Sequence, residues 1–225
     1  MISSVTVNKN NQTTSKCVNQ YDAKGNLTKT VDSIKNEVII YEYDLSNQLV
    51  CYKSYKDGKE ILRQENSYDG YGNRISKSEN GKKTYYYYED GNVLYTTNEY
   101  DTVTSINVVG DALGYTGTVR FENSQPVYYT YNKDIRTSIS GVISYNGKGI
   151  VTYSYDDFGN TKIKGNANFY NEICYTSAVY DETTSHYYMA ARYYDSATGR
   201  FITKDTYRGS KTEYGTCIRI APIIR

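Results

Sequence analysis

The sequence predicts an all-β protein built from repeated β-hairpins, and three observations carry this prediction. Tyrosine is the main bulky residue, with 29 Tyr against 4 Phe and no Trp, and tyrosine favours strands because its ring packs while its hydroxyl stays wet. Seventeen glycines stand against two prolines, a balance typical of turns and strands. A Tyr-Asp motif also recurs along the chain, which indicates a repeat architecture.

The motif recurs at intervals in the low twenties. The four clearest copies are Tyr21-Asp22 with Gly25-Asn26, Tyr43-Asp44, Tyr68-Asp69 with Gly72-Asn73, and Tyr155-Asp156 with Gly159-Asn160. Weaker copies begin at Tyr88, Tyr131, Tyr180 and Tyr194.

Each copy reads as a strand followed by a chain reversal. In "GIVTYSYDDFGN" the residues Val151, Tyr153 and Tyr155 alternate with polar residues, as in a strand with one buried face. Asp156 is expected to accept from backbone amides two residues on, while Gly159 supplies a positive φ that Asn160 also tolerates. Plainer hairpin signals stand at Asp57-Gly58, Asn80-Gly81 and Asn146-Gly147. One hairpin is marginal alone, so the repeats are expected to stack and share a buried face.

Composition excludes several classes of protein. The formal net charge is +1, which gives no footprint for nucleic-acid binding. No apolar run reaches the length of a membrane span, and the start "MISSVTVNKNNQTTSK" has no apolar segment typical of a signal peptide. The four cysteines, Cys17, Cys51, Cys174 and Cys217, form no C-x-x-C pair. We therefore expect small strand or core cysteines, and no metal or cofactor.

Candidate catalytic residues are few, and we predict no enzymatic activity. His186 is the one histidine and has no marked nucleophile partner, so a packed histidine is expected. Asp195 and Asp205 form a conceivable acid pair, but both precede turn-like sequences, which favours a structural role. Three arginines, Arg192, Arg200 and Arg208, are expected to pair with these aspartates in a network that holds the segment together.

The closing stretch "YYMAARYYDSATGRF" and the Tyr-Asp repeats resemble the Rhs family of YD-repeat proteins. The residues that carry the resemblance to its repeat-associated core are Tyr187, Tyr188, Arg192, Tyr193, Tyr194, Asp195, Gly199, Arg200 and Phe201. Ser196 replaces a usual proline, and His186 stands where leucine is common. The family's Asp-Pro-x-Gly cleavage motif has no match in this sequence.

The resemblance implies a fold and a role. YD repeats wind as one β-sheet into a hollow shell, and the core motif closes one end. Larger relatives hold a C-terminal toxin in that shell, and relatives include bacterial polymorphic toxins and wall-associated proteins, which are secreted or lie at the cell surface. The expected function is thus structural: part of a shell that encloses or presents an effector, with the remaining shell and the effector as partners.

The predicted organisation has three parts: YD-repeat sheet over 1–179, core motif over 180–209, and a divergent tail over 210–225. We interpret the final "CIRIAPIIR" as a shifted reading frame of the family's usual continuation, the alternative being an ordinary divergent tail. The alternative function is a module that binds cell-surface carbohydrate or a partner strand, because Tyr85 to Tyr88 must point to both faces of one strand.

Overall fold

The protein folds into two antiparallel sheets, as seen in a computed structural model that describes residues 2–7, 10, 12–110, 114–122, 124–166, 169, 171–190 and 192–205. The larger, which we name the wall sheet, has fifteen strands in sequence order. They are β1 Ile2–Val7, β2 Thr13–Tyr21, β3 Leu27–Asp32, β4 Glu37–Tyr43, β5 Leu49–Lys56, β6 Lys59–Tyr68, β7 Arg74–Glu79, β8 Lys82–Glu89, β9 Asn92–Asn98, β10 Val103–Gly110, β11 Gly114–Glu122, β12 Gln125–Lys133, β13 Ile139–Ser144, β14 Gly149–Tyr155 and β15 Thr161–Gly165.

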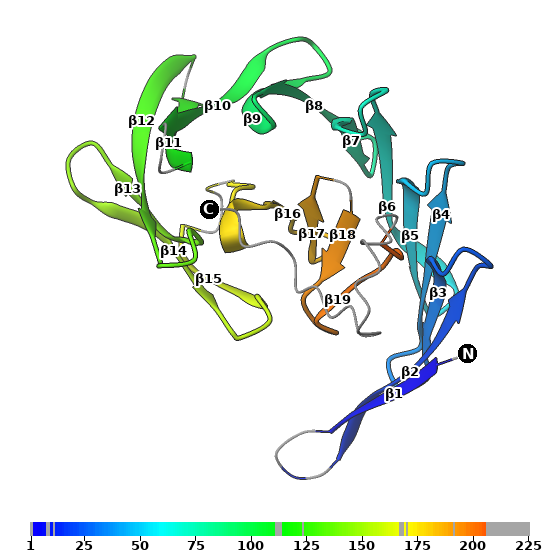
Figure 1. Cartoon of the computed structure of the whole chain (residues 1–225). Helices are drawn as coiled ribbons and strands as arrows, with labels where there is room; N and C mark the ends of the chain where they lie inside the picture. The colour runs from blue at the N-terminus through cyan, green and yellow to red at the C-terminus, as the bar shows by residue number, and fades with distance from the viewer. Residues whose placement is uncertain are drawn as a thin grey trace, which may run out of the picture.

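The smaller sheet, which we name the end sheet, follows in the chain. Its strands are β16 Val179–Asp181, β17 His186–Met189, β18 Arg192–Asp195 and β19 Arg200–Phe201, preceded by a short 3-10 turn at Tyr175–Ser177. Figure 1 shows the wall sheet curving as an open arc around the end sheet. The predicted all-β fold is confirmed, and no α-helix occurs in the part of the chain that the structure describes.

The Tyr-Asp turns all lie along one edge of the wall sheet. The strands are consecutive and antiparallel, so turns after even-numbered strands lie at one edge and turns after odd-numbered strands at the other. Asp22, Asp44, Asp69 and Asp156 follow β2, β4, β6 and β14. We call this line of turns, which lies at the ends of the strands and not along an outermost strand, the YD edge.

The turn at Asp156 has the predicted side-chain cap. Its Oδ1 accepts from the backbone N–H groups of Phe158 and Asn160, both at 2.9 Å, and Gly159 has a φ of +87°. The part assigned to Asn160 was wrong, because it does not share the positive φ. Its side-chain amide instead donates to Asp156 Oδ2 at 2.6 Å, which closes the loop from the other side.

Of the weak copies, that at Tyr88 is a shortened repeat, and that at Tyr131 was placed wrongly. At Tyr88 the reversal is a tight turn of Asp90 and Gly91, both with positive φ, as in other two-residue hairpins. Near Tyr131 the capping residue is Asp134, whose Oδ1 accepts from Arg136 N at 2.8 Å and Ser138 N at 2.9 Å. The repeat there is two residues out of step with the predicted position.

The motif tyrosines connect one repeat to the preceding one. The hydroxyls of Tyr43, Tyr68 and Tyr155 donate to backbone carbonyls at the start of β3, β5 and β13. The acceptors are Leu27 O at 2.7 Å, Leu49 O at 2.7 Å and Ile139 O at 2.6 Å. Each ring therefore covers the inner face while its hydroxyl satisfies a carbonyl that the turn leaves exposed, which explains why the repeat uses tyrosine rather than phenylalanine.

Several other features of the described residues bear on function. Cys51 and Cys174 are buried and Cys17 is half-buried, each as a free thiol. Among all the residues that the structure describes, no cluster of three or more potential metal ligands is found. No helix in the described ranges is long and apolar enough to span a bilayer. The predicted tail over 210–225, with Cys217, lies outside the described residues, as does Arg208.

Candidate functional site

Several side-chain hydrogen bonds join the end sheet to the YD edge in the part of the chain that the structure describes. Tyrosine hydroxyls of the end sheet reach the backbone of the wall turns. Tyr187 donates to Gly159 O at 3.0 Å and Tyr194 to Phe158 O at 3.0 Å. Tyr188 donates to Gly72 O at 3.1 Å. The core motif is therefore an anchor, in which each tyrosine packs its ring and uses its hydroxyl on a turn carbonyl.

Backbone hydrogen bonds add to this anchoring at two separate turns. Leu27 N donates to Ile202 O at 2.8 Å, and Ile139 N donates to Cys174 O at 3.1 Å. Both donors are the first residues of wall strands, directly after a YD-edge turn. The segments that flank the end sheet thus continue the hydrogen bonding of the wall at two separate turns.

One repeat has a charged residue at the position after Gly-Asn. Leu27, Leu49 and Ile139 occupy the corresponding site in three repeats and are buried apolar residues. The repeat of Tyr155 has the half-buried Thr161 there, and the repeat of Tyr68 has Arg74. Arg74 is fully buried, at 0% exposure. Its Nη1 and Nη2 contact Asp181 Oδ2 at 2.5 Å and Oδ1 at 3.0 Å, a two-pronged pairing that suits a planar guanidinium.

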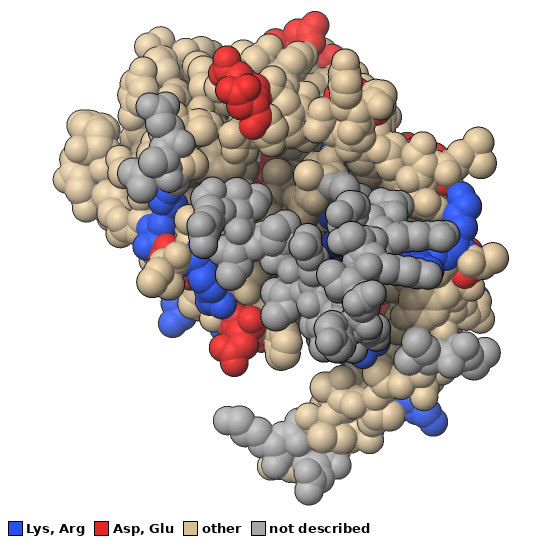
Figure 2. Space-filling view, viewed as in Figure 1, with Lys and Arg blue, Asp and Glu red and all other residues tan. Residues whose placement is uncertain are grey.

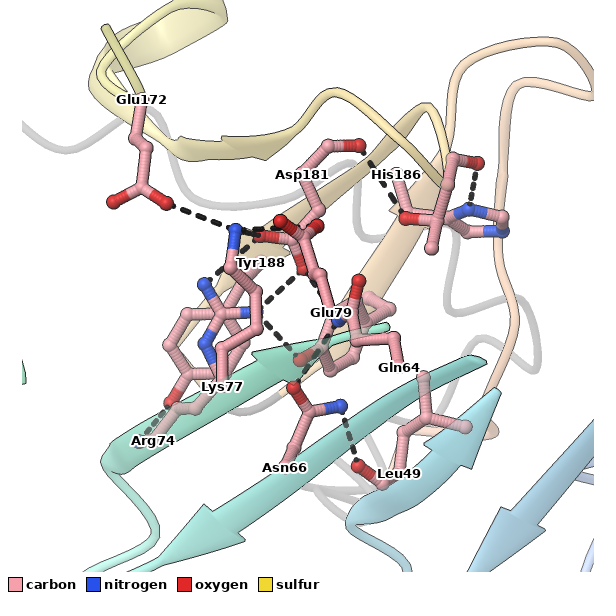
Figure 3. A network of polar contacts seen from close by, with 12 residues as sticks. Leu49, Gln64, Asn66, Arg74, Lys77, Glu79, Glu172, Asp181, His186 and Tyr188 are labelled. Atoms are coloured by element: carbon pink, nitrogen blue, oxygen red, sulfur yellow. Dashed lines mark hydrogen bonds and ion pairs between the residues drawn. The ribbon is translucent and has the colours of Figure 1, made fainter. Parts of the chain in front are cut away.

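A second cation extends the pairing, as Figure 3 shows. Lys77 Nζ lies 2.9 Å from Glu172 Oε1 and 3.2 Å from Asp181 Oδ1. Arg74 and Lys77 come from β7 of the wall sheet, Asp181 from β16, and Glu172 from the segment before it. We call these four residues the charged network. Two buried cations of the wall face two buried anions from β16 and the segment before it, and Glu79 of β7 adds a partly exposed carboxylate 3.4 Å from Lys77 Nζ.

Neutral groups complete the coordination of the charged network. Gln64 Nε2 donates to Asp181 Oδ2 at 2.9 Å, and the Tyr86 hydroxyl donates to Glu172 Oε1 at 2.8 Å. The Tyr193 hydroxyl accepts from Arg74 Nη1 at 2.9 Å. The guanidinium also lies over the rings of Tyr86 and Tyr188, 4.8 and 4.7 Å from their centroids, which favours a cation in a dry site.

These contacts set the protonation of Asp181. Burial by itself would raise the pKa of this carboxyl, but the charges of Arg74 and Lys77 and the hydrogen bonds hold its pKa well below the ordinary value. The group stays ionised, so the junction contains charges that must remain paired. Removing one partner of a buried pair costs about 3–5 kcal/mol because the other charge is left uncompensated.

The arginine–aspartate pairing predicted for the core motif forms in part. Arg192 pairs with Asp205 at 3.1 Å and lies 3.7 Å from the Phe201 ring centroid. Asp195 instead caps its own turn, accepting from Ala197 N at 2.9 Å and from the Thr198 hydroxyl at 2.7 Å. The two aspartates are therefore not brought together as an acid pair.

His186 is a packed residue, as expected. Its ring meets those of Tyr41 and Tyr52 edge-on, at centroid distances of 6.1 and 5.7 Å. Its Nδ1 lies 2.6 Å from Thr184 O, the arrangement of an Nδ1–H donor to a carbonyl. No serine or cysteine nucleophile is hydrogen-bonded to this ring in the described structure.

Sequence reasoning missed the charged network. Asp181 follows Tyr180 and was assigned to a weak repeat, but it lies in β16 at 0% exposure rather than in a turn. Arg74 gave a usable signal, since it stands where the two preceding repeats have leucine. A charged residue at a position that is apolar in most other repeats indicates a buried partner from elsewhere in the chain.

Comparison with known proteins gives relatives along most of the chain. No family model matches. The chain is 32% identical over 197 residues to the tRNA3(Ser)-specific nuclease WapA of Bacillus spizizenii, and 32% over 194 residues to the tRNA nuclease WapA of Bacillus subtilis. Each match covers 84% of this chain but 8% of the relative, so the chain spans about a twelfth of the length of these proteins.

Solved structures give the same fold. The complex TcdB2-TccC3-Cdc42 matches with a TM-score of 0.56 at 19% identity, over 88% of this chain and 12% of that one. The Tc holotoxin pore of Photorhabdus luminescens matches with a TM-score of 0.56 at 19% identity, over 87% of this chain and 12% of that one.

Fold and junction together define a class of protein: a curved wall of Tyr-Asp hairpins with a small tyrosine-rich sheet anchored at its YD edge. The matches to the WapA proteins agree with the repeat motif, the core motif and the arc of strands. The chain belongs to the Rhs family of YD-repeat proteins.

Proposed function

We propose that this chain is a structural section of a larger Rhs-type shell, consisting of wall and end sheet, which encloses or presents a C-terminal effector. The observation that carries the proposal is the buried junction, in which wall cations pair with anions from the end region. Buried ion pairs that hold the end sheet against the wall sheet are what a closed shell needs at its wall. The relatives are named as tRNA nucleases, which suggests a nuclease as the effector of the longer proteins.

In this proposal the chain itself performs no catalysis. The ionisable groups at the junction are buried and paired with each other, and His186 is packed between rings. Location at the cell wall or outside the cell is proposed by analogy with wall-associated relatives. Incubating the purified chain and following its intact mass over days tests the absence of self-cleavage, and discrete fragments that form at a rate independent of protein concentration would contradict it.

The shell role is tested by exchange of the matching segment. This chain would replace its counterpart in Bacillus subtilis WapA, and the protease resistance of the C-terminal region would be measured. We expect protection equal to that of the parent protein. A chimera carrying Asp181→Asn is the matched control and should lose protection. If both chimeras leave the C-terminal region as sensitive as a protein without the segment, the proposal fails.

Glycan binding at the outer face is a second candidate, favoured by one observation. Tyr86 and Tyr88 face inward, since their hydroxyls bond to Glu172 and Arg74 O, so strand alternation places Tyr87 on the outer face. The rings of Tyr87 and Tyr95 stack there, 4.2 Å apart and 8° from parallel. A glycan array with the protein and its Tyr87→Ala variant tests this. The candidate is rejected if the protein binds no glycan, or if the variant keeps every signal of the parent protein.

A further inference from the structure

The last strand of the wall sheet has a free edge. β15 pairs with β14 and, among the strands that the structure describes, with no other. Lys162, Ile163, Lys164 and Gly165 are exposed. Figure 1 shows β15 at one end of the open arc, with β1 at the other end. An unpaired edge presents backbone donors and acceptors that a further strand can use.

A cavity of about 110 Å³ lies on the inner side of this edge. Its lining residues are Tyr153, Ile163, Gly165, Phe169, Asn171, Tyr180 and Glu182. Ile163 and Gly165 belong to β15 itself, so an added strand would bring its inward side chains to this cavity. The lining combines the rings of Tyr153, Phe169 and Tyr180 with the polar Asn171 and Glu182, so this space has room for one side chain placed against the rings.

The outer side of the edge is basic. Lys162 and Lys164 alternate with Ile163 and therefore point outward. Their cross-strand neighbours in β14 are Ser154 and Thr152, which bring no charge, and no ion pair joins either lysine to a carboxylate of the described residues. Figure 2 shows basic side chains over the β14–β15 end of this face, with an acidic cluster beside them and further charged groups elsewhere on the face.

We propose that the free edge of β15 binds an extended acidic segment as an added strand. Its outward side chains are Asp or Glu beside Lys162 and Lys164, and one inward apolar side chain enters the cavity. Opposite charges on neighbouring strands stabilise pairing, and like charges oppose it. This excludes a second copy of β15 as the preferred occupant, because lysines would then face lysines. The inference concerns a binding site and does not depend on the proposed shell function.

The test uses short fluorescent peptides and fluorescence anisotropy at low ionic strength. We expect the peptide EVEVEVE to bind, and KVKVKVK to bind more weakly by about tenfold, since each cross-strand charge pair contributes about 0.2–1 kcal/mol and changes sign. The double variant Lys162→Glu/Lys164→Glu should reverse the preference. The control Lys59→Glu/Lys82→Glu makes the same charge change on interior strands β6 and β8 and should leave the preference unchanged.

Two further peptides examine the mode of binding. Methylation of alternate backbone nitrogens of EVEVEVE removes donors and should abolish binding if the peptide adds as a strand. Glycine in place of its central valine should weaken binding if a side chain fills the cavity. Equal affinity for the acidic and basic peptides would overturn the proposal, and so would affinity that methylation leaves unchanged. The proposal also fails if the protein self-associates and the Lys162/Lys164 variant changes that self-association.

Discussion

The repeats around Leu49 and Arg74 share one turn design and differ in the side chain that directly follows the turn. In both, a capping aspartate, Asp44 or Asp69, accepts from the amide two residues on at 2.9 Å. In both, a tyrosine hydroxyl from the next repeat bonds to the carbonyl of the residue after the turn. Leu49 packs in the apolar core, whereas Arg74 meets Asp181 of the end sheet. The turn fixes the position, and the side chain decides whether the wall packs on itself or holds the end sheet.

The largest expected effect comes from removing one charge of the network. Asp181→Asn should lower the free energy of unfolding by about 3–5 kcal/mol, because Arg74 and Lys77 would be left buried without their shared counter-ion. Urea unfolding followed by circular dichroism measures the change. The control is Asp205→Asn, which breaks the half-exposed ion pair to Arg192 and should cost about 1 kcal/mol or less. Equal losses in the two variants would contradict the distinction.

The same comparison predicts a dependence on pH. The pKa of Asp181 is lower in the folded protein than in the unfolded chain, so the folded state binds its proton less readily. The stabilisation is complete above the unfolded pKa of about 4 and is lost as pH falls below it. Asp32, whose pKa is lowered to about 2 despite the opposing effect of its burial, adds to the loss.

Thermal unfolding between pH 7 and pH 2 measures this dependence. We expect the wild-type protein to lose stability steeply below about pH 4, and Asp181→Asn to lose less over the same range, with the Asp32 contribution remaining in both. Parallel curves for the two proteins would show that Asp181 does not carry the effect.

A smaller loss of stability is expected when a glycine is replaced in a wall turn that contacts the 3-10 turn before the end sheet, compared with a wall turn that does not. Gly159 and Gly58 both have positive φ, +87° and +77°, so alanine is strained at both. A Cβ at Gly159 would also lie 2.7 Å from a ring carbon of Tyr175, whereas at Gly58 it would meet nothing within 4 Å. Gly159→Ala should therefore cost about 1–3 kcal/mol more than Gly58→Ala, and a similar melting temperature for both variants would refute the contact.

The smallest effect concerns the tyrosine bond common to the repeats. Tyr155→Phe keeps the ring but removes the donor to Ile139 O, and should cost about 1 kcal/mol. Tyr145→Phe, at a site that is 83% exposed, is the control and should change the stability by a few tenths of a kcal/mol at most. Chemical denaturation of both variants gives the comparison, and a neutral Tyr155→Phe would mean that packing alone retains the tyrosine.

The sequence predicted what depends on local chemistry. Turn residues such as Asp156 and Gly159 act within five residues, so their spacing gave the hairpins and the all-β fold. Asp134 was missed because Lys133 stands where the motif has tyrosine, although the aspartate alone suffices to cap the turn. The network was missed because Arg74 and Asp181 are 107 residues apart, and the sequence alone does not bring them together. Asp181 also follows a tyrosine, which imitates the motif.

The most direct test of the central claim, that paired buried charges fix the end sheet to the wall, is a double-mutant cycle on Arg74 and Asp181. The free energy of unfolding would be measured for the wild-type protein, Arg74→Met, Asp181→Leu and the double variant. Each single variant leaves a buried charge, so we expect the double variant to lose at least about 2 kcal/mol less than the sum of the two single losses. Additivity within about 0.5 kcal/mol would mean that the two side chains do not stabilise each other, and would contradict the account.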